Sequence, residues 1–422
     1  MEYRPLKQNE RIELIDALRG FALFGILMVN LPLMYQPMSQ MMAGADPDAS
    51  TLKIIGESFI KFFFEGKFYV IFSMLFGFGF WIFMNKSKGQ EKSTLPIFKR
   101  RLLFLLLFGI AHISLLWAGD VLLFYALFGF LLLLFRKSSD KKIIRWAIVL
   151  ALLPTILMAL MMLIISLFSQ VPEAKETIGV QFQENMILME ELINRAAAIY
   201  STGSLSEIIS IRIEEYLTLL SGTLFFFCPV ILAMFLTGFL IARKGIVSDY
   251  EEKLSLMRKV FWWGLVIGII TSALYTISYR YAIMSIPNIW ALLSTSMHTI
   301  GGISLGLCYV SGITILFIKG KSGFFRKFLV PIGRMALTNY LMQSIIAVLL
   351  FHSYGLGLFG KIAVWQSIIL TVIIFALQAL FSRWWLSQYQ FGPFEWVWRS
   401  LTYRKFQPMK KQHRPIVETR AI

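Results

Sequence analysis

Cysteine and histidine are scarce in this sequence. Its 422 residues include 2 cysteines and 4 histidines, and only 15% are charged. Both cysteines, Cys228 and Cys308, fall in apolar runs, and neither lies at the spacing of a disulfide framework or a zinc motif. The histidines likewise show no ligand spacing. We therefore expect neither structural disulfides nor a metal centre.

Acidic residues are in the minority, since 24 aspartates and glutamates face 41 lysines and arginines, and the formal net charge is +17. The basic residues lie in short clusters between apolar runs instead of forming one long patch. This distribution is typical of membrane topology and of contact with anionic lipid. We therefore expect membrane lipid, and not nucleic acid, as a partner.

Apolar residues make up 57% of the chain, and the mean hydropathy is +0.68. The first apolar run begins near Ile12 without a small-residue cleavage site, which predicts an uncleaved helix. Ten runs are long enough to cross a bilayer, so the expected fold class is all-α, a polytopic membrane protein. The ten transmembrane helices are predicted near residues 13–33, 67–85, 100–117, 120–135, 144–169, 217–242, 259–279, 290–318, 328–351 and 361–383.

The connections between these runs alternate in charge. One set, which includes both ends of the chain, carries lysine and arginine clusters such as those at 99–101, 136–145 and 319–327. The other set has few basic residues and more acidic ones. Because lysine and arginine stay inside, both termini are predicted to be cytoplasmic, and the protein to lie in the bacterial cytoplasmic membrane.

The chain shows no internal repeat and no sharp domain boundary. The long connection at 171–216 has helical spacing and is predicted to lie on the outer surface. It divides a five-helix N-terminal half, residues 1–170, from a five-helix C-terminal half, residues 217–405. A basic cytoplasmic tail is expected at 406–422.

The stretch 100–130 predicts two apolar helices joined by a tight turn at 118–119, and it holds the candidate active site. A histidine inside a membrane helix is costly, so His112 is a candidate general base whose orientation is set by Asp120. Structural roles fit the same residues. His112 would bond to a backbone carbonyl or to Tyr125, Asp120 would cap the second helix, and the tyrosine ring would pack.

A second group of polar residues is expected on the cytoplasmic side. Asp16 and Arg19 are three apart on one helical face, so either they form an interfacial ion pair or Arg19 faces inward and binds phosphate. Arg101 and Arg334 either join Arg19 in a basic inner mouth or supply positive charge at helix ends. Asn339, about one turn deeper, either bonds across helices or belongs to the same binding site.

Several segments carry a resemblance to known membrane proteins. LRGFALFGILMVN, residues 18–30, resembles the first helix of the transmembrane acyltransferase clan, which includes the heparan glucosaminide acetyltransferase-like proteins. The clan's arginine and outer polar residue match Arg19 and Asn30. The segments GKFYVIFSMLFGFGF at 66–80, GRMALTNYLMQS at 333–344 and GPFEWVWRSLTY at 392–403 resemble a narrower bacterial group, the YeiB-like membrane proteins of unassigned function.

The clan resemblance implies acyl transfer with acyl-CoA, in its simplest form acetyl-CoA, as the cytoplasmic co-substrate. The acceptor would be a hydroxyl or amine on an extracytoplasmic or lipid-linked glycan, lipid or small molecule. Arg19, Arg101, Arg334 and Asn339 are the residues we expect to hold the CoA, and no metal is implied. A homodimer is compatible with these features.

The chain departs from the clan in one respect. In the glucosaminide acetyltransferases the histidine that acts as base or acyl carrier resembles a position in the first outer loop, but residues 1–111 of this chain contain no histidine. We therefore expect His112 to supply the base, with Asp120 as its orienting partner. Asn30 would donate a hydrogen bond near the reacting carbonyl, and Tyr125 would lie beside them.

Two other classes of function fit the same residues. In a transporter or flippase of a small or lipid-linked solute, they would line a path across the bilayer. Matched broken helices in the two halves would favour that interpretation, and the sequence shows no such pair. A membrane sensor or scaffold without catalysis is the third interpretation.

Overall fold

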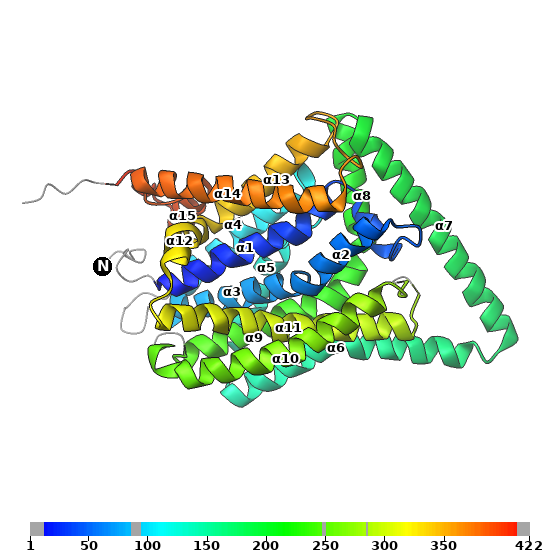
Figure 1. Cartoon of the computed structure of the whole chain (residues 1–422), viewed down its shortest axis with the longest axis horizontal. Helices are drawn as coiled ribbons and strands as arrows, with labels where there is room; N and C mark the ends of the chain where they lie inside the picture. Colours follow the sequence, from blue (N-terminus) through cyan, green and yellow to red (C-terminus); the bar gives the residue numbers. More distant parts are fainter. Residues whose placement is uncertain (1–11, 86–93, 247–249, 284–285, 412–422) are drawn as a thin grey trace, which may run out of the picture.

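The computed structural model describes residues 12–85, 94–246, 250–283 and 286–411, which fold mainly into helices (Figure 1). The α-helices are α1 (Glu13–Met34), α2 (Thr51–Phe63), α3 (Lys67–Asn85), α4 (Leu95–Leu115), α5 (Leu122–Leu132), α6 (Asp140–Phe168), α7 (Pro172–Thr202), α8 (Leu205–Gly222), α9 (Cys228–Arg243), α10 (Leu254–Tyr279), α11 (Ile289–Ile318), α12 (Val330–Arg334), α13 (Ala336–Phe351), α14 (Val364–Gln388) and α15 (Pro393–Tyr403). Shorter helical turns are η2 (Met38–Met42), η3 (Leu133–Phe135), η4 (Thr223–Phe227), η5 (Tyr250–Lys253) and η6 (Phe325–Leu329). Most of the predicted tail, residues 412–422, lies outside the described residues.

Short polar side chains fix where several helices begin. Ser139 at the start of α6 and Asn288 at the start of α11 each accept a hydrogen bond from the backbone N–H three residues later. Ser204 and Glu207 form a reciprocal capping box at the start of α8. These contacts satisfy amide groups that the first turn of a helix leaves unpaired.

Among the described residues, seven helices are long and apolar enough to cross a membrane. An eighth is added if the bent pair Phe325–Arg334 and Ala336–Phe351, which meet at 82°, is one span. Several of these helices expose apolar side chains over much of their length, as α6 does at Leu152, Ile156, Leu163 and Ile164. Such faces suit a lipid environment. The expectation of a multi-pass, all-α membrane protein is confirmed at this level.

The bundle has two distinct ends. Figure 1 shows α12 and α15 at the end where α1 begins, whereas α7 lies across the opposite end, between α6 and α8. The predicted connection 171–216 is helical throughout most of its length, as α7 and the first part of α8. Only the C-terminal part of α7 packs, through Leu192, Ala196 and Tyr200; Ile187 and Leu188 are exposed.

Glycine lets two pairs of helices approach to backbone contact. A Cβ atom at Gly77 of α3 would lie 1.9 Å from the Phe235 carbonyl oxygen of α9, and one at Gly238 of α9 would lie 1.8 Å from the Met74 carbonyl oxygen. In the same way, a Cβ atom at Gly333 of α12 would lie 1.8 Å from the Asp16 carbonyl oxygen of α1. Only glycine permits these separations, which are typical of helix packing in membranes.

Candidate functional site

A cavity of about 990 Å³ lies at the end of the bundle where α1 finishes. Its wall comes from the ends of α1, α2, α10, α11 and α14 together with α5 and α8. Three of the predicted catalytic residues, Asn30, Asp120 and Tyr125, line it. The wall contains both aromatic rings and polar groups. This mixture is typical of sites that hold a ligand by shape and orient it by a few hydrogen bonds.

His112 and Asp120 meet across the turn that joins α4 to α5, as the predicted hairpin requires. The His112 Nδ1 and Asp120 Oδ1 atoms are 3.0 Å apart, and both side chains are completely buried. Their alignment departs from that of an ideal hydrogen bond. Asp120 also caps α5, because its Oδ2 accepts the Leu123 N–H at 2.7 Å. The capping role predicted for Asp120 is therefore present, and its other carboxylate oxygen contacts His112.

The third member of this group is Ser344, which comes from α13, 232 residues further along the chain. The His112 Nε2 and Ser344 Oγ atoms are 2.8 Å apart, and Ser344 is 1% exposed. In the tautomer that carries its proton on Nδ1, which faces Asp120, the Nε2 atom accepts a hydrogen bond from the serine hydroxyl. Carboxylate, imidazole and hydroxyl thus follow one another as in an activated serine.

Tyr340 packs against the imidazole of this group and also lines the cavity. Its ring lies 5.1 Å, centre to centre, from the His112 ring, and Tyr340 lines the cavity while His112 does not. Tyr340 and Ser344 are four residues apart, so they share one face of α13. A ligand in the cavity meets the tyrosine and Asp120 before it reaches the imidazole.

Tyr125 is directed toward a different partner from the one considered in the sequence. Its hydroxyl lies 2.7 Å from the Ser73 Oγ of α3, and its ring contacts Phe76 and Phe235. The hydroxyl therefore joins α5 to α3 while the ring fills the core between α3, α5 and α9. Among the described residues, the Tyr125 hydroxyl makes no hydrogen bond to His112.

Charged groups also line the cavity at the break between α2 and α3. Lys61 and Glu65 form an ion pair at 3.1 Å, and the Tyr275 hydroxyl of α10 donates to Glu65 at 2.7 Å. The His298 ring packs against the Tyr275 ring at 5.0 Å. Gly66 follows with a φ of +88°, a conformation that glycine adopts without strain. The break between α2 and α3 thus places an ion pair in the cavity wall.

The residues predicted to hold CoA lie elsewhere and do not line the cavity. Arg19 pairs with Asp16 at 2.9 Å and keeps about a third of its side chain exposed. Arg101 stacks on the Trp398 ring at 4.3 Å, and α12 brings Arg334 to the same end of α1. Asn339 is bonded across helices, since its amide donates to Ser382 at 3.0 Å and to the Ile332 carbonyl.

Helix α15 closes this end of the bundle. Glu395 accepts the Thr338 N–H at 3.0 Å and the Thr338 hydroxyl at 2.5 Å. Burial raises the pKa of the Glu395 carboxyl above its usual range, and the bonds from Thr338 oppose that rise. A buried carboxyl group thus anchors α15 to α13.

Sequence reasoning missed a buried charged cluster near α7. Arg212 donates to the Ser114 carbonyl at 2.8 Å and approaches His352. Glu215 accepts from the Tyr200 hydroxyl at 2.8 Å and from the backbone and hydroxyl of Ser39. The signal was available, because charged residues three apart interrupt the apolar pattern of α8.

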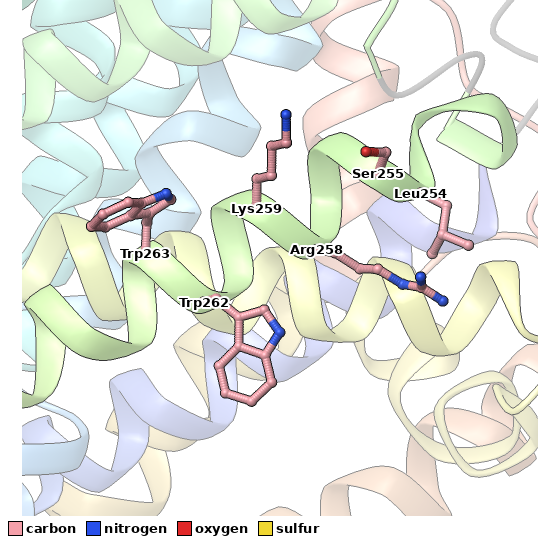
Figure 2. Close-up of a pocket in the computed structure, with 6 residues that line it drawn as sticks. All are labelled: Leu254, Ser255, Arg258, Lys259, Trp262 and Trp263. Atoms are coloured by element: carbon pink, nitrogen blue, oxygen red, sulfur yellow. The ribbon is translucent and has the colours of Figure 1, made fainter.

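A second hollow, on the surface of α10, has a simpler explanation. Figure 2 shows Arg258 and Trp262 projecting from one side of the helix and Lys259 and Trp263 from the other. The side chains do not converge on one point. Exposed tryptophans one turn from basic residues are typical of the membrane interface.

Long helices with exposed apolar surfaces around a cavity lined by aromatic and polar residues indicate a multi-pass membrane protein. A model of the family described as "Protein of unknown function (DUF418)" matches residues 241–405. The chain is 35% identical over 423 residues to the uncharacterized protein YxaH of Bacillus subtilis, which covers 97% of this chain and 98% of that one. It is 25% identical over 418 residues to the uncharacterized protein YeiB of Escherichia coli, with 94% and 98% covered.

The chain therefore belongs to the bacterial membrane protein family that includes YxaH and YeiB. The YeiB-like resemblance drawn from three separate segments is confirmed, and membership of the wider acyltransferase clan stays a prediction. No solved structure matches the chain.

Proposed function

We propose that this protein is a membrane acyltransferase that moves an acyl group from cytoplasmic acyl-CoA to a hydroxyl or amine in the cavity. One observation carries the proposal: Asp120, His112 and Ser344 form a connected carboxylate–imidazole–hydroxyl series beside that cavity. A hydroxyl beside an imidazole that a third group orients is the arrangement of an activated nucleophile. The resemblance of residues 18–30 to the acyltransferase clan supports the same reaction.

The proposed chemistry has two balanced steps. Ser344 Oγ attacks the thioester carbonyl while His112 Nε2 takes the hydroxyl proton, and the C–S bond breaks as the CoA thiolate receives that proton. The acceptor hydroxyl or amine then attacks the Ser344 ester. His112 takes the acceptor proton and returns it to Ser344 Oγ as the C–O bond breaks. Asp120 keeps the imidazole in the tautomer that both steps need.

The proposed topology brings the donor to this site from the cytoplasmic side. Adding α4 and the α5–η3 segment to the eight candidate spans gives ten, with both termini inside the cell. Arg19 and Asn30 are eleven residues apart on α1, so about 16 Å separates them along the helix axis. In this proposal the arginine end holds the CoA phosphates, and the acyl end of the donor extends along α1 to the cavity, where Asn30 contacts acyl donor or acceptor.

Binding of acetyl-CoA to the purified protein in detergent, measured by calorimetry, tests the proposal. We expect saturable binding by the wild type, roughly 10- to 100-fold weaker binding after Arg19→Ala because a charge-assisted phosphate contact is lost, and little change after His112→Ala. Arg258→Ala is the matched control, because it removes an exposed arginine of α10.

The same protein also reports on the chemistry. Wild type incubated with acetyl-CoA should acquire an acetyl group on the peptide that contains Ser344, and His112→Ala should not. Absence of acetyl-CoA binding by folded wild type would rule out the acyltransferase function.

A second candidate, transport of a small or lipid-linked solute, is favoured by the interrupted helices. The break between α2 and α3 at Gly66 lines the cavity, and α12 and α13 bend by 82°. Half-helices of this kind occur around transporter binding sites. Solute flux into proteoliposomes that lack CoA, abolished by Glu65→Gln, would support transport over acyl transfer.

A further inference from the structure

Four hydrogen-bond donors on the cavity wall are buried without hydrogen bonds to other described residues. One is the Thr295 hydroxyl, and the other three are the Nε1 atom of Trp117 and the hydroxyls of Tyr216 and Tyr340. Trp117 is 8% exposed and Tyr340 is 4% exposed. A buried donor with no acceptor costs about 1–3 kcal/mol, so four on one wall call for an explanation.

The three aromatic donors come from different elements. Trp117 precedes the turn after α4, Tyr216 belongs to α8 and Tyr340 to α13, and all three line the same cavity. Both tyrosine hydroxyls lie within electrostatic reach of Asp120. The Tyr340 hydroxyl also lies near the Val121 backbone without a well-formed bond to it. A Cβ atom at Gly119 would lie 2.3 Å from the Trp117 ring, so this ring also lies beside the residue that precedes Asp120.

These three groups act mainly as hydrogen-bond donors. An indole N–H only donates, and a tyrosine hydroxyl donates a stronger hydrogen bond when its acceptor is an oxygen anion. The acceptor capacity nearby belongs to Asp120, which already contacts His112 and the Leu123 N–H. A ligand that satisfies the wall must present an oxygen that accepts several hydrogen bonds.

We propose that Trp117, Tyr216 and Tyr340 form the oxyanion site of the enzyme and bind the carbonyl oxygen of the acyl group. This inference rests on the acyltransferase function proposed above. Tyr340 is four residues from Ser344 on the same face of α13, so an acyl carbon at Ser344 Oγ holds its oxygen toward this wall. When the tetrahedral intermediate forms, the negative charge develops on that oxygen, and donors already in place stabilise it.

The inference extends the site beyond the residues predicted from the sequence. Asn30 was the donor expected near the reacting carbonyl, and it also lines the cavity. Trp117, Tyr216 and Tyr340 differ from it in that each has a buried donor atom without a partner among the described residues. The carbonyl oxygen is therefore assigned to these three side chains.

Single-donor variants test the assignment. Tyr340→Phe, Tyr216→Phe and Trp117→Phe each remove one donor while an aromatic ring stays in place. With acetyl-CoA as the probe and release of the CoA thiol as the readout, we expect each variant to lower kcat about 100-fold with little change in KM. Tyr281→Phe is the control, because it removes the hydroxyl of an exposed tyrosine at the end of α10.

A spectroscopic readout separates oxyanion binding from a structural role. Donors to the thioester carbonyl lower its infrared stretching frequency, so bound acetyl-CoA should show a lowered frequency in wild type. Each donor variant should reverse part of that shift, and Tyr281→Phe should not. Active wild type with unchanged kcat and carbonyl frequency in all three variants would overturn the oxyanion site and leave acyl transfer standing. Wild type that neither binds nor cleaves acetyl-CoA would instead overturn acyl transfer itself.

Discussion

Arg212 and Glu215 are 1% and 0% exposed, and each buried charge of α8 has partners from other segments. Arg212 joins α8 to the Ser114 carbonyl and to His352, and Glu215 joins it to Tyr200 and Ser39. A buried charge that loses its partner is costly, so this cluster fixes α7 and α8 against the loops around them. His352 is the member whose ordinary pKa lies near physiological pH.

His352 should make the stability of the protein depend on pH. Burial, with the nearby Arg212 charge, lowers the pKa of the His352 imidazole to about 3. The unfolded chain therefore binds a proton at higher pH than the folded protein does. The stability due to neutral His352 is complete above about pH 6.5 and is lost as the pH falls toward 3, by about 2 kcal/mol at pH 5.

Thermal unfolding in detergent checks this sign. The Tm of wild type should fall between pH 7 and pH 5, and His352→Gln should reduce that fall because the titrating group is gone. An equal fall in both proteins would assign the pH dependence to other groups.

At the scale of helices, close packing depends on glycine more than on apolar area. Helices in lipid gain little from burying apolar side chains against one another, so contact between backbones contributes much of their association. Gly77 and Gly238 provide that contact between α3 and α9, and these helices also carry Ser73 and much of the packing around Tyr125. Separation of α3 from α9 would therefore disturb the packing of Tyr125, which lines the cavity.

Gly238→Ala should therefore destabilise the protein, because its Cβ would lie 1.8 Å from the Met74 carbonyl oxygen. We expect a Tm several degrees below that of wild type in a thermal-shift measurement. Gly179→Ala is the matched control, since nothing lies within 4 Å of its Cβ position in α7. There alanine should be neutral or stabilising by up to about 1 kcal/mol. Equal Tm values for the two variants would contradict backbone contact between α3 and α9.

At the scale of the whole molecule, the proposed orientation gives the two ends different access to solvent. The end with Arg19, Arg101 and Arg334 would face the cytoplasm, where positive charge is retained. The end covered by α7 would face outward, together with the mouth of the cavity. Gly179 in α7 and Gly323 before η6 both have open space at their Cβ positions, so a cysteine fits at either.

A membrane-impermeant maleimide tests that orientation in intact cells. In a chain with Cys228 and Cys308 replaced by alanine, Gly179→Cys should be labelled without permeabilisation and Gly323→Cys only after it. The reverse pattern would show that the protein has the opposite orientation in the membrane. Labelling of both cysteines in intact cells would contradict the ten-span arrangement.

The amino-acid sequence by itself determined the class of molecule, the hairpin around residues 118–119 and the family. Those features depend on hydropathy, helix period and local order, which are local properties of the chain. The apposition of His112 and Asp120 was predicted because eight residues and one turn separate them.

Only the tertiary structure decided what faces these residues. Ser344 meets His112 from 232 residues away, and Tyr216 and Tyr340 reach the same wall from two other helices. The pattern of α13 places Tyr340 and Ser344 on one face, but it does not say which distant helix that face meets. Asn339 shows the same limit, because its partner Ser382 lies on α14 and makes it a link between helices. Packing between distant segments therefore set the site, and the local pattern could not.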